Sequence, residues 1–386
     1  MLDFTTIRVL VTEAGGKQSV TMVRGLKEIG CHVTVVCSDK NATCYVSNKP
    51  DIKILDEHIA DHDENTLENL LALGQTGNYD VLMPIGEQGT NFVTQHEDEL
   101  RQHVRLACAP RSAYINAFDK QRTFEIANRI GIPIPRTRMR GQTVEDYLST
   151  VSFPLIIKPR NGLGSIGFHK FEKREDFEPY LEEHQINLDD YVLQEFVDYE
   201  KRLGTILFMD QKGNVCMAYA DEVLRWFPID AGTACLIRSI DHQEAIKWSS
   251  DLLREMKWQG IAALSFMIDR NSGVPKLLEI NGRVPASIRL SYQCGFNPAK
   301  LLTQLAYGET VEQYPVNTRF GLMTRQFDLD LAWFLKSGKR FSAEPSWFSW
   351  RNTKEALFYR DDRRPFFANL FTKTIGYRRI MKKKQH

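Results

Sequence analysis

The sequence has no long hydrophobic run and almost no net charge, and both absences limit what the protein can be. No stretch reaches the roughly 18 consecutive apolar residues that a membrane-spanning helix needs. The first residues also lack the apolar segment and small-residue cleavage site of a signal peptide. With 50 Lys+Arg against 49 Asp+Glu the net charge is +1, which argues against a general nucleic-acid binder. We therefore expect a cytoplasmic globular protein of two or three domains.

Cysteine and glycine motifs are equally sparse. The seven cysteines are scattered and contain no Cys-x-x-Cys pair, which favours buried thiols over a zinc site or a disulfide framework. The glycines that follow the first predicted strand stand in the segment 13–19, EAGGKQS. This segment does not match Gly-x-Gly-x-x-Gly, so we expect a loop that leads into a helix and not a dinucleotide site.

The first hundred residues alternate strand and helix patterns. Apolar runs predict strands at 7–11, 33–37 and 79–84. Helical periodicity predicts one helix that ends at Gly30 and a second around Leu67–Leu73. Strand and helix in alternation indicate a parallel sheet with helices on its faces.

The next motif is a glycine-rich loop between two strands. After a helix capped by Asp119, the run 153–159 predicts a strand, 160–167 a loop and 168–170 a second strand. Such a loop can direct successive N–H groups at a phosphate chain, although a hairpin without a ligand has the same pattern. Lys158 favours the phosphate site, because an ammonium at the end of an apolar strand needs an anion. The loop residues concerned are Gly162, Gly164, Ser165 and Gly167.

A predicted hairpin carries the second polar motif. Strands at 261–269 and 275–280 flank a turn, and alternation along the second strand puts Glu279, Asn281 and Arg283 on one face. The two oxygen-bearing side chains suit Mg²⁺, and the guanidinium suits phosphoryl oxygens. The alternative is a surface ion pair between Glu279 and Arg283. The apolar neighbours favour a functional site, because buried charges need partners.

In this order, the motifs resemble the ATP-grasp superfamily, and in particular its carbamoyl-phosphate-synthase-large-chain-like and D-alanine-ligase-like members. The resemblance covers roughly residues 5–310 and ends with LLEINGR at 277–283. It implies a mixed α/β and α+β protein in four parts. These are an N-terminal parallel α/β (pre-ATP-grasp) domain over 1–115, two ATP-grasp subdomains over 116–190 and 191–325, and a basic, aromatic-rich extension over 326–386.

The resemblance also implies roles for individual residues in binding ATP and Mg²⁺. Lys120 and Lys158 would contact the phosphates, and the loop glycines with Ser165 would form a mobile lid. Arg283 would stabilise the transferred phosphoryl group. The other implied positions are the adenine-binding hinge Gln194, Glu195, Phe196 and Val197, the ribose-binding Glu200, and the metal ligands Glu279 and Asn281.

One departure concerns the second metal-binding acid of the family, which would fall on Ser265 or Met267 here. Either the nearby Asp269 contributes after a change of register, or a second Mg²⁺ is held more weakly. On the substrate side, the resemblance places Arg225 and Arg238 over the acceptor site, where either could bind a carboxylate. Solvated arginines at a strand edge are the alternative. Two further candidates are Ser287, beside the acyl-phosphate position, and Glu87, after the third strand.

The leading functional hypothesis is an ATP- and Mg²⁺-dependent carboxylate–amine ligase that works through an acyl phosphate. Its partners would be a small carboxylate and an amine, with a homodimer as the default assembly. One alternative is a carboxyphosphate-forming enzyme of the biotin-dependent or carbamoyl type. The other is an ATP-binding regulator or scaffold that has no turnover.

The C-terminal region differs from the rest of the chain in charge. Residues 331–386 carry 14 Lys+Arg and 4 Asp+Glu, a net charge of +10, together with many aromatic residues. Such a mixture can dock on an anionic lipid surface or partner. The favoured alternative is an extension packed on the main body by its aromatic side chains, because Pro345, Pro365 and Gly376 interrupt any amphipathic period.

Overall fold

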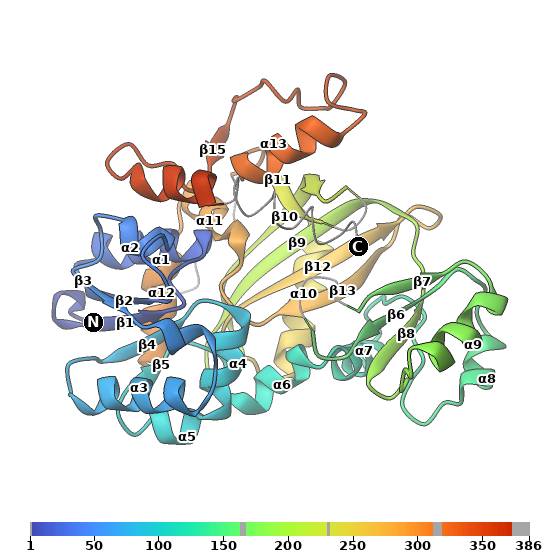
Figure 1. The fold of residues 1–386 in the computed structure, drawn as a ribbon, viewed down its shortest axis with the longest axis horizontal. Helices are drawn as coiled ribbons and strands as arrows, with labels where there is room; N and C mark the ends of the chain where they lie inside the picture. Colours follow the sequence, from blue (N-terminus) through green and yellow to red (C-terminus); the bar gives the residue numbers. More distant parts are fainter. Residues whose placement is uncertain (1, 163–166, 230–231, 312–318, 373–386) are drawn as a thin grey trace.

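The computed structural model describes residues 2–162, 167–229, 232–311 and 319–372. Within this part the chain forms a five-stranded, a three-stranded and a seven-stranded sheet. Figure 1 shows the five-stranded sheet on one side, the three-stranded sheet on the other and the seven-stranded sheet between them.

The N-terminal sheet is parallel, with the strand order β3-β2-β1-β4-β5. Helices cover both faces, so its central strands are mostly apolar and almost fully buried. The predicted N-terminal α/β fold is therefore confirmed. Its elements are β1 (Arg8–Thr12), α1 (Lys17–Glu28), β2 (His32–Cys37), α2 (Thr43–Val46), β3 (Ile52–Leu55), α3 (Glu64–Gln75), β4 (Val81–Pro84), α4 (Glu87–Gln95), α5 (Glu97–Leu100) and β5 (Arg105–Leu106).

Two strands of this sheet were not predicted, and each lacks a hydrophobic signal. β3 lies at the edge, and its Ile52 is 47% exposed, so it carries no buried apolar pattern. β5 has only two residues. Edge strands of this kind depend on pairing with a neighbour, which a local sequence pattern does not reveal.

The three-stranded sheet is antiparallel, with the order β7-β6-β8. Its core contains Leu155, Ile157, Phe171, Phe177 and Leu193. The predicted strand, loop and strand over 153–170 form the β6–β7 hairpin. The elements are α8 (Val144–Leu148), β6 (Leu155–Pro159), β7 (His169–Phe171), α9 (Arg174–Glu183) and β8 (Tyr191–Glu195).

The seven-stranded sheet lies at the centre of the molecule. Its strand order is β13-β12-β9-β10-β11-β14-β15. One face, through Ile206, Tyr219 and Ala263, shares a core with the N-terminal sheet. The other face, through Leu207 and Leu264, packs under α10 and α6. The elements are α6 (Arg111–Phe118), β9 (Tyr199–Met209), β10 (Val215–Phe227), β11 (Thr233–Ile240), α10 (Gln243–Glu255), β12 (Gly260–Asp269), β13 (Pro275–Asn281), α11 (Arg289–Gln293), α12 (Pro298–Ala306), β14 (Met323–Arg325), α13 (Phe327–Lys336) and β15 (Thr353–Glu355). The predicted β12–β13 hairpin is confirmed.

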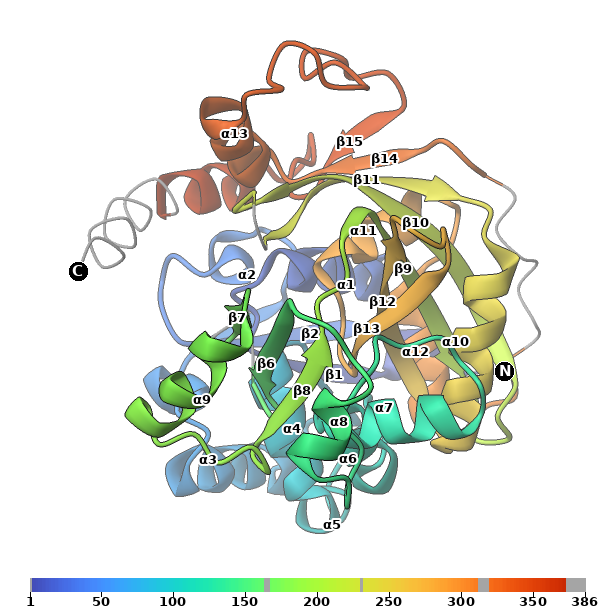
Figure 2. The same cartoon turned by 90° about the vertical axis from the view of Figure 1, so that its right-hand side faces the viewer.

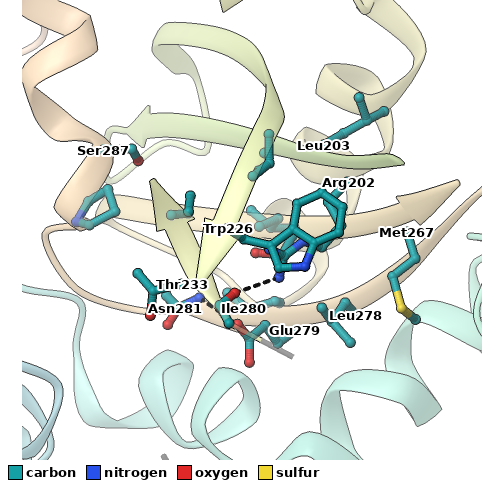
Figure 3. A pocket seen from close by; sticks show the side chains of 18 of the residues that line it. Arg202, Leu203, Trp226, Thr233, Met267, Leu278, Glu279, Ile280, Asn281 and Ser287 are labelled. Atoms are coloured by element: carbon teal, nitrogen blue, oxygen red, sulfur yellow. Dashed lines mark hydrogen bonds between the residues drawn. The ribbon is translucent and has the colours of Figure 1, made fainter. Parts of the chain in front are cut away.

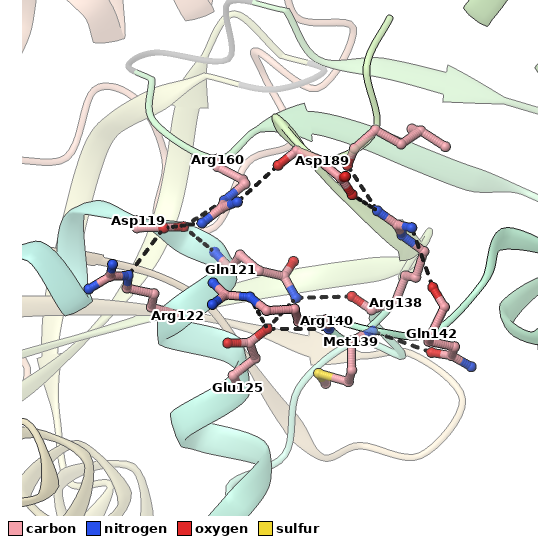
Figure 4. Close-up of polar contacts among 11 residues, drawn as sticks. Asp119, Gln121, Arg122, Glu125, Arg138, Met139, Arg140, Gln142, Arg160 and Asp189 are labelled. Atoms are coloured by element: carbon pink, nitrogen blue, oxygen red, sulfur yellow. Dashed lines mark hydrogen bonds and ion pairs between the residues drawn. The ribbon is translucent and has the colours of Figure 1, made fainter.

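A polar network joins the three-stranded sheet to helix α7 (Lys120–Arg129) (Figure 4). The Asp119 carboxylate caps α7 by accepting from the Gln121 N–H at 3.0 Å, as predicted from its N-cap position. The same carboxylate accepts from Arg160 Nε at 3.1 Å, and the Lys120 N–H donates to the Arg160 carbonyl at 3.0 Å. These contacts tie the start of α7 to the end of β6, and so they place Lys120 near Lys158.

The described part of the C-terminal extension packs on the main body, as the favoured interpretation expects. Strand β15 pairs with β14 and so adds an edge strand to the seven-stranded sheet, and Leu357 is fully buried in the core beneath it. The Tyr359 ring lies 3.9 Å from the Arg24 guanidinium and 3.5 Å from that of Arg289. Figure 2 shows the extension above the rest of the molecule. Among the described residues, no helix is both long enough and apolar enough to cross a membrane.

Candidate active site

A pocket of about 1180 Å³ lies where the three sheets meet. The floor of the pocket is formed by the seven-stranded sheet. It belongs to the face of that sheet that packs on the N-terminal sheet, in the part that lies beyond their shared core. Strands β6 and β8 and the start of α4 supply other walls. Figure 3 shows side chains of β9, β12 and β13 directed into this space.

The end of β13 brings the predicted polar motif together. Asn281 Nδ2 donates to Glu279 Oε1 at 3.3 Å, and Arg283 Nη2 donates to Asn281 Oδ1 at 3.1 Å. The Arg283 Nε lies 3.6 Å from Glu87 Oε2, which comes from the N-terminal part of the chain. All four side chains line the pocket, and Ser287 lines it nearby. Burial raises the pKa of the Glu87 carboxyl despite the opposing effect of Arg283.

Two lysines face this motif across the pocket. Lys158 Nζ is 3.4 Å from the Leu278 carbonyl and 4.7 Å from the centre of the Phe124 ring. Burial lowers the pKa of Lys158 to about 7, and the Glu279 carboxylate only partly opposes that shift. Lys120 Nζ donates to the Gly162 carbonyl at 2.8 Å. The site thus holds an ammonium group whose charge is poorly balanced within the protein.

The segment expected to bind adenine forms the next wall of the pocket. Gln194, Glu195, Phe196 and Val197 all line it. Gln194 Nε2 donates to Thr137 Oγ1 at 2.7 Å, and Lys276 Nζ donates to Glu195 Oε1 at 2.8 Å. Because both polar side chains are held by protein partners, this segment has a defined shape before any nucleotide arrives.

Other sequence candidates lie elsewhere. Arg225 lines no part of the pocket and forms a buried ion pair with Asp330, with Nε 2.6 Å from Oδ1. Arg238 pairs with Glu222 outside the pocket lining. Gly167 is exposed at the end of the β6–β7 loop and is also not part of the lining. Gly164, Ser165 and the Glu200 side chain lie outside the described residues.

The oxygen donors of the pocket would suit a single Mg²⁺ ion that is shared with a nucleotide. They do not suit a metal held by protein side chains alone. Glu279 and Asn281 offer a carboxylate and an amide oxygen on the same face of β13. Asp269 does not join them, because its Oδ2 lies 2.8 Å from Lys276 Nζ and it lines no part of the pocket. Among the described residues, groups of three His, Cys, Asp or Glu arranged to hold a metal are absent. Phosphate oxygens of a nucleotide would have to complete the coordination.

The structure adds Arg202 of β9, which the sequence analysis missed. Its Nη1 donates to the Gly232 carbonyl at 2.9 Å, and its guanidinium lies 4.4 Å from the centre of the Trp226 ring. Its Nε and Nη2 are buried without a hydrogen-bond partner among the described residues. Burial also lowers its pKa. Lys201 and Arg202 are adjacent in the sequence, and only the strand register shows which of them turns inward.

Parts of the sequence are similar to known proteins. Residues 233–328 match the family model described as ATP-grasp in the biosynthetic pathway with Ter operon. The carbamoyl phosphate synthase large chain of Acidobacterium capsulatum is 24% identical over 270 residues, which are 64% of this chain and 24% of that protein. The chain thus spans about a quarter of the length of the curated relatives it matches.

Solved structures agree on the fold. Biotin carboxylase from Campylobacter jejuni superimposes with a TM-score of 0.67 at 16% identity, covering 82% of this chain and 74% of that one. The L-amino acid ligase from Bacillus licheniformis gives a TM-score of 0.60 at 17% identity, covering 78% and 74%. The chain has an ATP-grasp fold, and the resemblance drawn from its motifs is confirmed. Within that fold it is similar to the carbamoyl phosphate synthase large chain.

Proposed function

We propose that the protein is an ATP- and Mg²⁺-dependent ligase that joins a carboxylate to an amine through an acyl phosphate. The observation that carries this proposal is the convergence, in one pocket, of Lys120, Lys158 and Arg283 with the Glu279–Asn281 pair. Phosphoryl transfer needs positioning and neutralisation of charge, and these groups supply both. The relatives and structural neighbours include enzymes named as synthases, carboxylases and ligases, which supports this reaction class.

In this proposal, different parts of the pocket have different roles. Segment 194–197 would hold the adenine, and the two lysines would neutralise the phosphates. Glu279 and Asn281 would hold Mg²⁺, which when bound supplies further positive charge to the phosphate oxygens. Arg283 would donate to the transferred phosphoryl group, and its contacts with Asn281 and Glu87 would orient it. The ion pair between Glu87 and Arg283 also links this centre to the N-terminal sheet.

The acceptor side of the pocket would be formed with help from the N-terminal part of the chain. Gln18, Glu87, Ser287 and Gln326 line this side. Glu87 and Ser287 therefore stay candidates for substrate binding, whereas Arg225 and Arg238 do not line the pocket. We also keep as a proposal the division of the chain at residues 115, 190 and 325. The three sheets support the first two boundaries, whereas β15 of the extension continues the seven-stranded sheet across the third.

A carboxyphosphate-forming enzyme is the second candidate. The observation that favours it is the extent of the match to biotin carboxylase, which covers 82% of this chain. In such a reaction bicarbonate would take the place of the organic carboxylate. Bicarbonate dependence of ADP release separates the two candidates.

The first experiment measures ADP release from ATP and Mg²⁺ across a panel of amino acids, small carboxylates, bicarbonate and amines. Lys158→Ala and Glu279→Ala run beside the wild type. Lys247→Ala is the matched control, because that lysine is largely exposed on α10. Release that needs one carboxylate and one amine, and that is lost in both pocket variants only, would support the ligase. If the wild type binds ATP but releases no ADP with any mixture, the non-catalytic alternative gains.

A further inference from the structure

Asp221 of β10 is a carboxylic acid that the nucleotide site leaves unused. It lines the pocket, and only 3% of its surface is exposed. Its backbone is paired in the sheet, but its carboxylate has no hydrogen-bond or ion-pair partner among the described residues. A carboxylate taken out of water without a partner is costly, so its place in the wall of a pocket suggests a cationic ligand.

The strand register connects Asp221 with the Mg²⁺ end of the pocket. Asp221 is opposite Gly204, Gly204 is opposite Ser265, and Ser265 is opposite Glu279. Residues directly opposite each other lie on the same face of a sheet. The two acids therefore stand at the ends of one row across the pocket floor, roughly 14 Å apart at the backbone, or three spacings of about 4.8 Å.

The two residues between them are small, and this keeps the row open. A Cβ at Gly204 would stand 2.9 Å from Asp221 Oδ1 and 3.0 Å from Oδ2, so a larger residue there would displace this carboxylate from its present position. Ser265 adds only a hydroxyl. A carboxylate substrate that binds over these two residues would have its carboxyl group near Glu279. The amine that reacts with it would then lie near Asp221.

The electrostatic surroundings favour a proton-accepting role. Burial, with a smaller contribution from the charge of the adjacent Glu222, raises the pKa of the Asp221 carboxyl to about 7. Glu222 itself is paired with Arg238. Arg202 lies at the next inward position of β9, opposite Val223, and makes no ion pair with Asp221 within the described part of the chain.

We propose that Asp221 binds the ammonium group of the amine substrate and accepts its proton before the amine attacks. This inference rests on the proposed ligase function. Asp221 takes one proton from the ammonium, and the neutral nitrogen forms a bond to the acyl carbon. The bond from that carbon to the phosphate oxygen then breaks, and its electron pair leaves with the phosphate. The phosphate takes the second nitrogen proton, and Asp221 returns its own to water.

The test compares two nucleophiles on the same protein. Hydroxylamine is neutral near pH 7 and traps an acyl phosphate as a hydroxamate, so it needs no proton acceptor. An ammonium-bearing amine needs one. Both products are measured with the carboxylate that gives wild-type hydroxamate, using Asp221→Asn, Gly204→Ala and the matched control Glu222→Gln. Thermal unfolding and Mg²⁺–ADP binding establish that each variant is folded.

We expect D221N to lower the ratio of amide to hydroxamate formation by ~10²–10⁴-fold, the usual range for loss of an acid–base group. G204A should lower the ratio in the same direction, and E222Q should change it far less, because Glu222 contributes less than burial to the pKa of Asp221. An equal loss of both products in folded D221N would overturn the role of Asp221 and leave the ligase intact. Absence of hydroxamate with every carboxylate would instead overturn the ligase proposal, and the role of Asp221 with it.

Discussion

The molecule contains two groups of buried charges, and they differ in how completely the protein satisfies them. Under α13, Arg225 donates to both oxygens of Asp330, at 2.6 and 2.9 Å, and to the Pro345 carbonyl at 3.0 Å. In the pocket, Lys158 has one distant carbonyl at 3.4 Å, and two nitrogens of Arg202 have no partner. All three donor nitrogens of Arg225 are thus satisfied by protein oxygens, although Nε and Nη1 of the neighbouring Arg325 have no hydrogen-bond partner among the described residues. Lys158 and Arg202 keep donors that face the pocket and could bind a ligand.

This difference teaches how to separate structural from functional charges. Arg225 and Arg283 are both arginines on or beside β-strands near the centre of the chain, and both were candidates for binding substrates or phosphates. Only the partners distinguish them, because a guanidinium that already donates from three nitrogens has little left for a ligand. The four predictions that follow test this contrast, beginning with the largest expected effect.

Loss of Asp330 should damage the fold. Asp330→Ala leaves Arg225 and Arg325 buried without their shared carboxylate, so we expect the free energy of unfolding to fall by about 3–5 kcal/mol. Urea unfolding measures the change. Asp361→Ala is the control: it removes a half-exposed partner of Arg24, and we expect a loss of at most about 1 kcal/mol. Equal losses would mean that the cluster under α13 is not structural.

Loss of Glu279 should damage catalysis and leave the fold intact. Because this carboxylate is the only acid of the proposed Mg²⁺ pair, Glu279→Gln should reduce ADP release by ~10²–10³-fold. Its free energy of unfolding should change by less than about 1 kcal/mol, as for other partly exposed polar positions. Steady-state ADP release and urea unfolding are measured on the same preparation. Turnover that survives the substitution would remove Glu279 from the site.

Two arginines sharpen the contrast further. Arg283→Ala should lower kcat by about 10²-fold, the effect of losing one donor to a transferred group, with a smaller change in the KM for ATP. Arg238→Ala should leave both constants near wild type, because Arg238 pairs with Glu222 outside the pocket lining. Steady-state kinetics over a range of ATP concentrations measures both. A loss of turnover in R238A alone would restore the interpretation of Arg238 as a substrate ligand.

The smallest effect concerns pH. In the folded protein the pKa of Lys158 is lowered to about 7, whereas in the unfolded chain it should stay near 10.4. The cost of burying its charge is therefore complete below pH 7 and is relieved as the pH rises toward the unfolded value. Nucleotide phosphates favour the charged form, so affinity for Mg²⁺–ADP should weaken above pH 7 by up to about tenfold per pH unit.

Calorimetry in buffers of different ionisation enthalpy measures this linkage. Above pH 7, binding should be accompanied by proton uptake in the wild type. Lys158→Met should show weaker binding and lose that part of the uptake. Proton uptake that is unchanged in the variant would place the titrating group elsewhere.

Local motifs predicted one end of the site well. Glu279, Asn281 and Arg283 alternate along a single strand, so their common face follows from the backbone period of two. Lys158 ends an apolar strand beside a glycine-rich loop, which is also a local pattern. These residues line the pocket together, as expected.

The other end depends on contacts between distant segments. Asp221 faces the pocket because β10 pairs with β9 in one register, and a shift by one residue would turn it away. Arg225 lies past a register shift of β10 against β11 and is buried against Asp330 of α13, 105 residues further along the chain. A local pattern of residues contains neither the register nor the partner.

The sequence by itself determined the three central strands of the parallel N-terminal sheet, the two hairpins and the polar motif of β13, because each follows from periodicity within a short segment. The tertiary structure decided which charges are closed by protein partners and which face the pocket. The physical reason is that the cost of a buried charge depends on its neighbours in space. Those neighbours come from strands and helices that meet only in the folded chain.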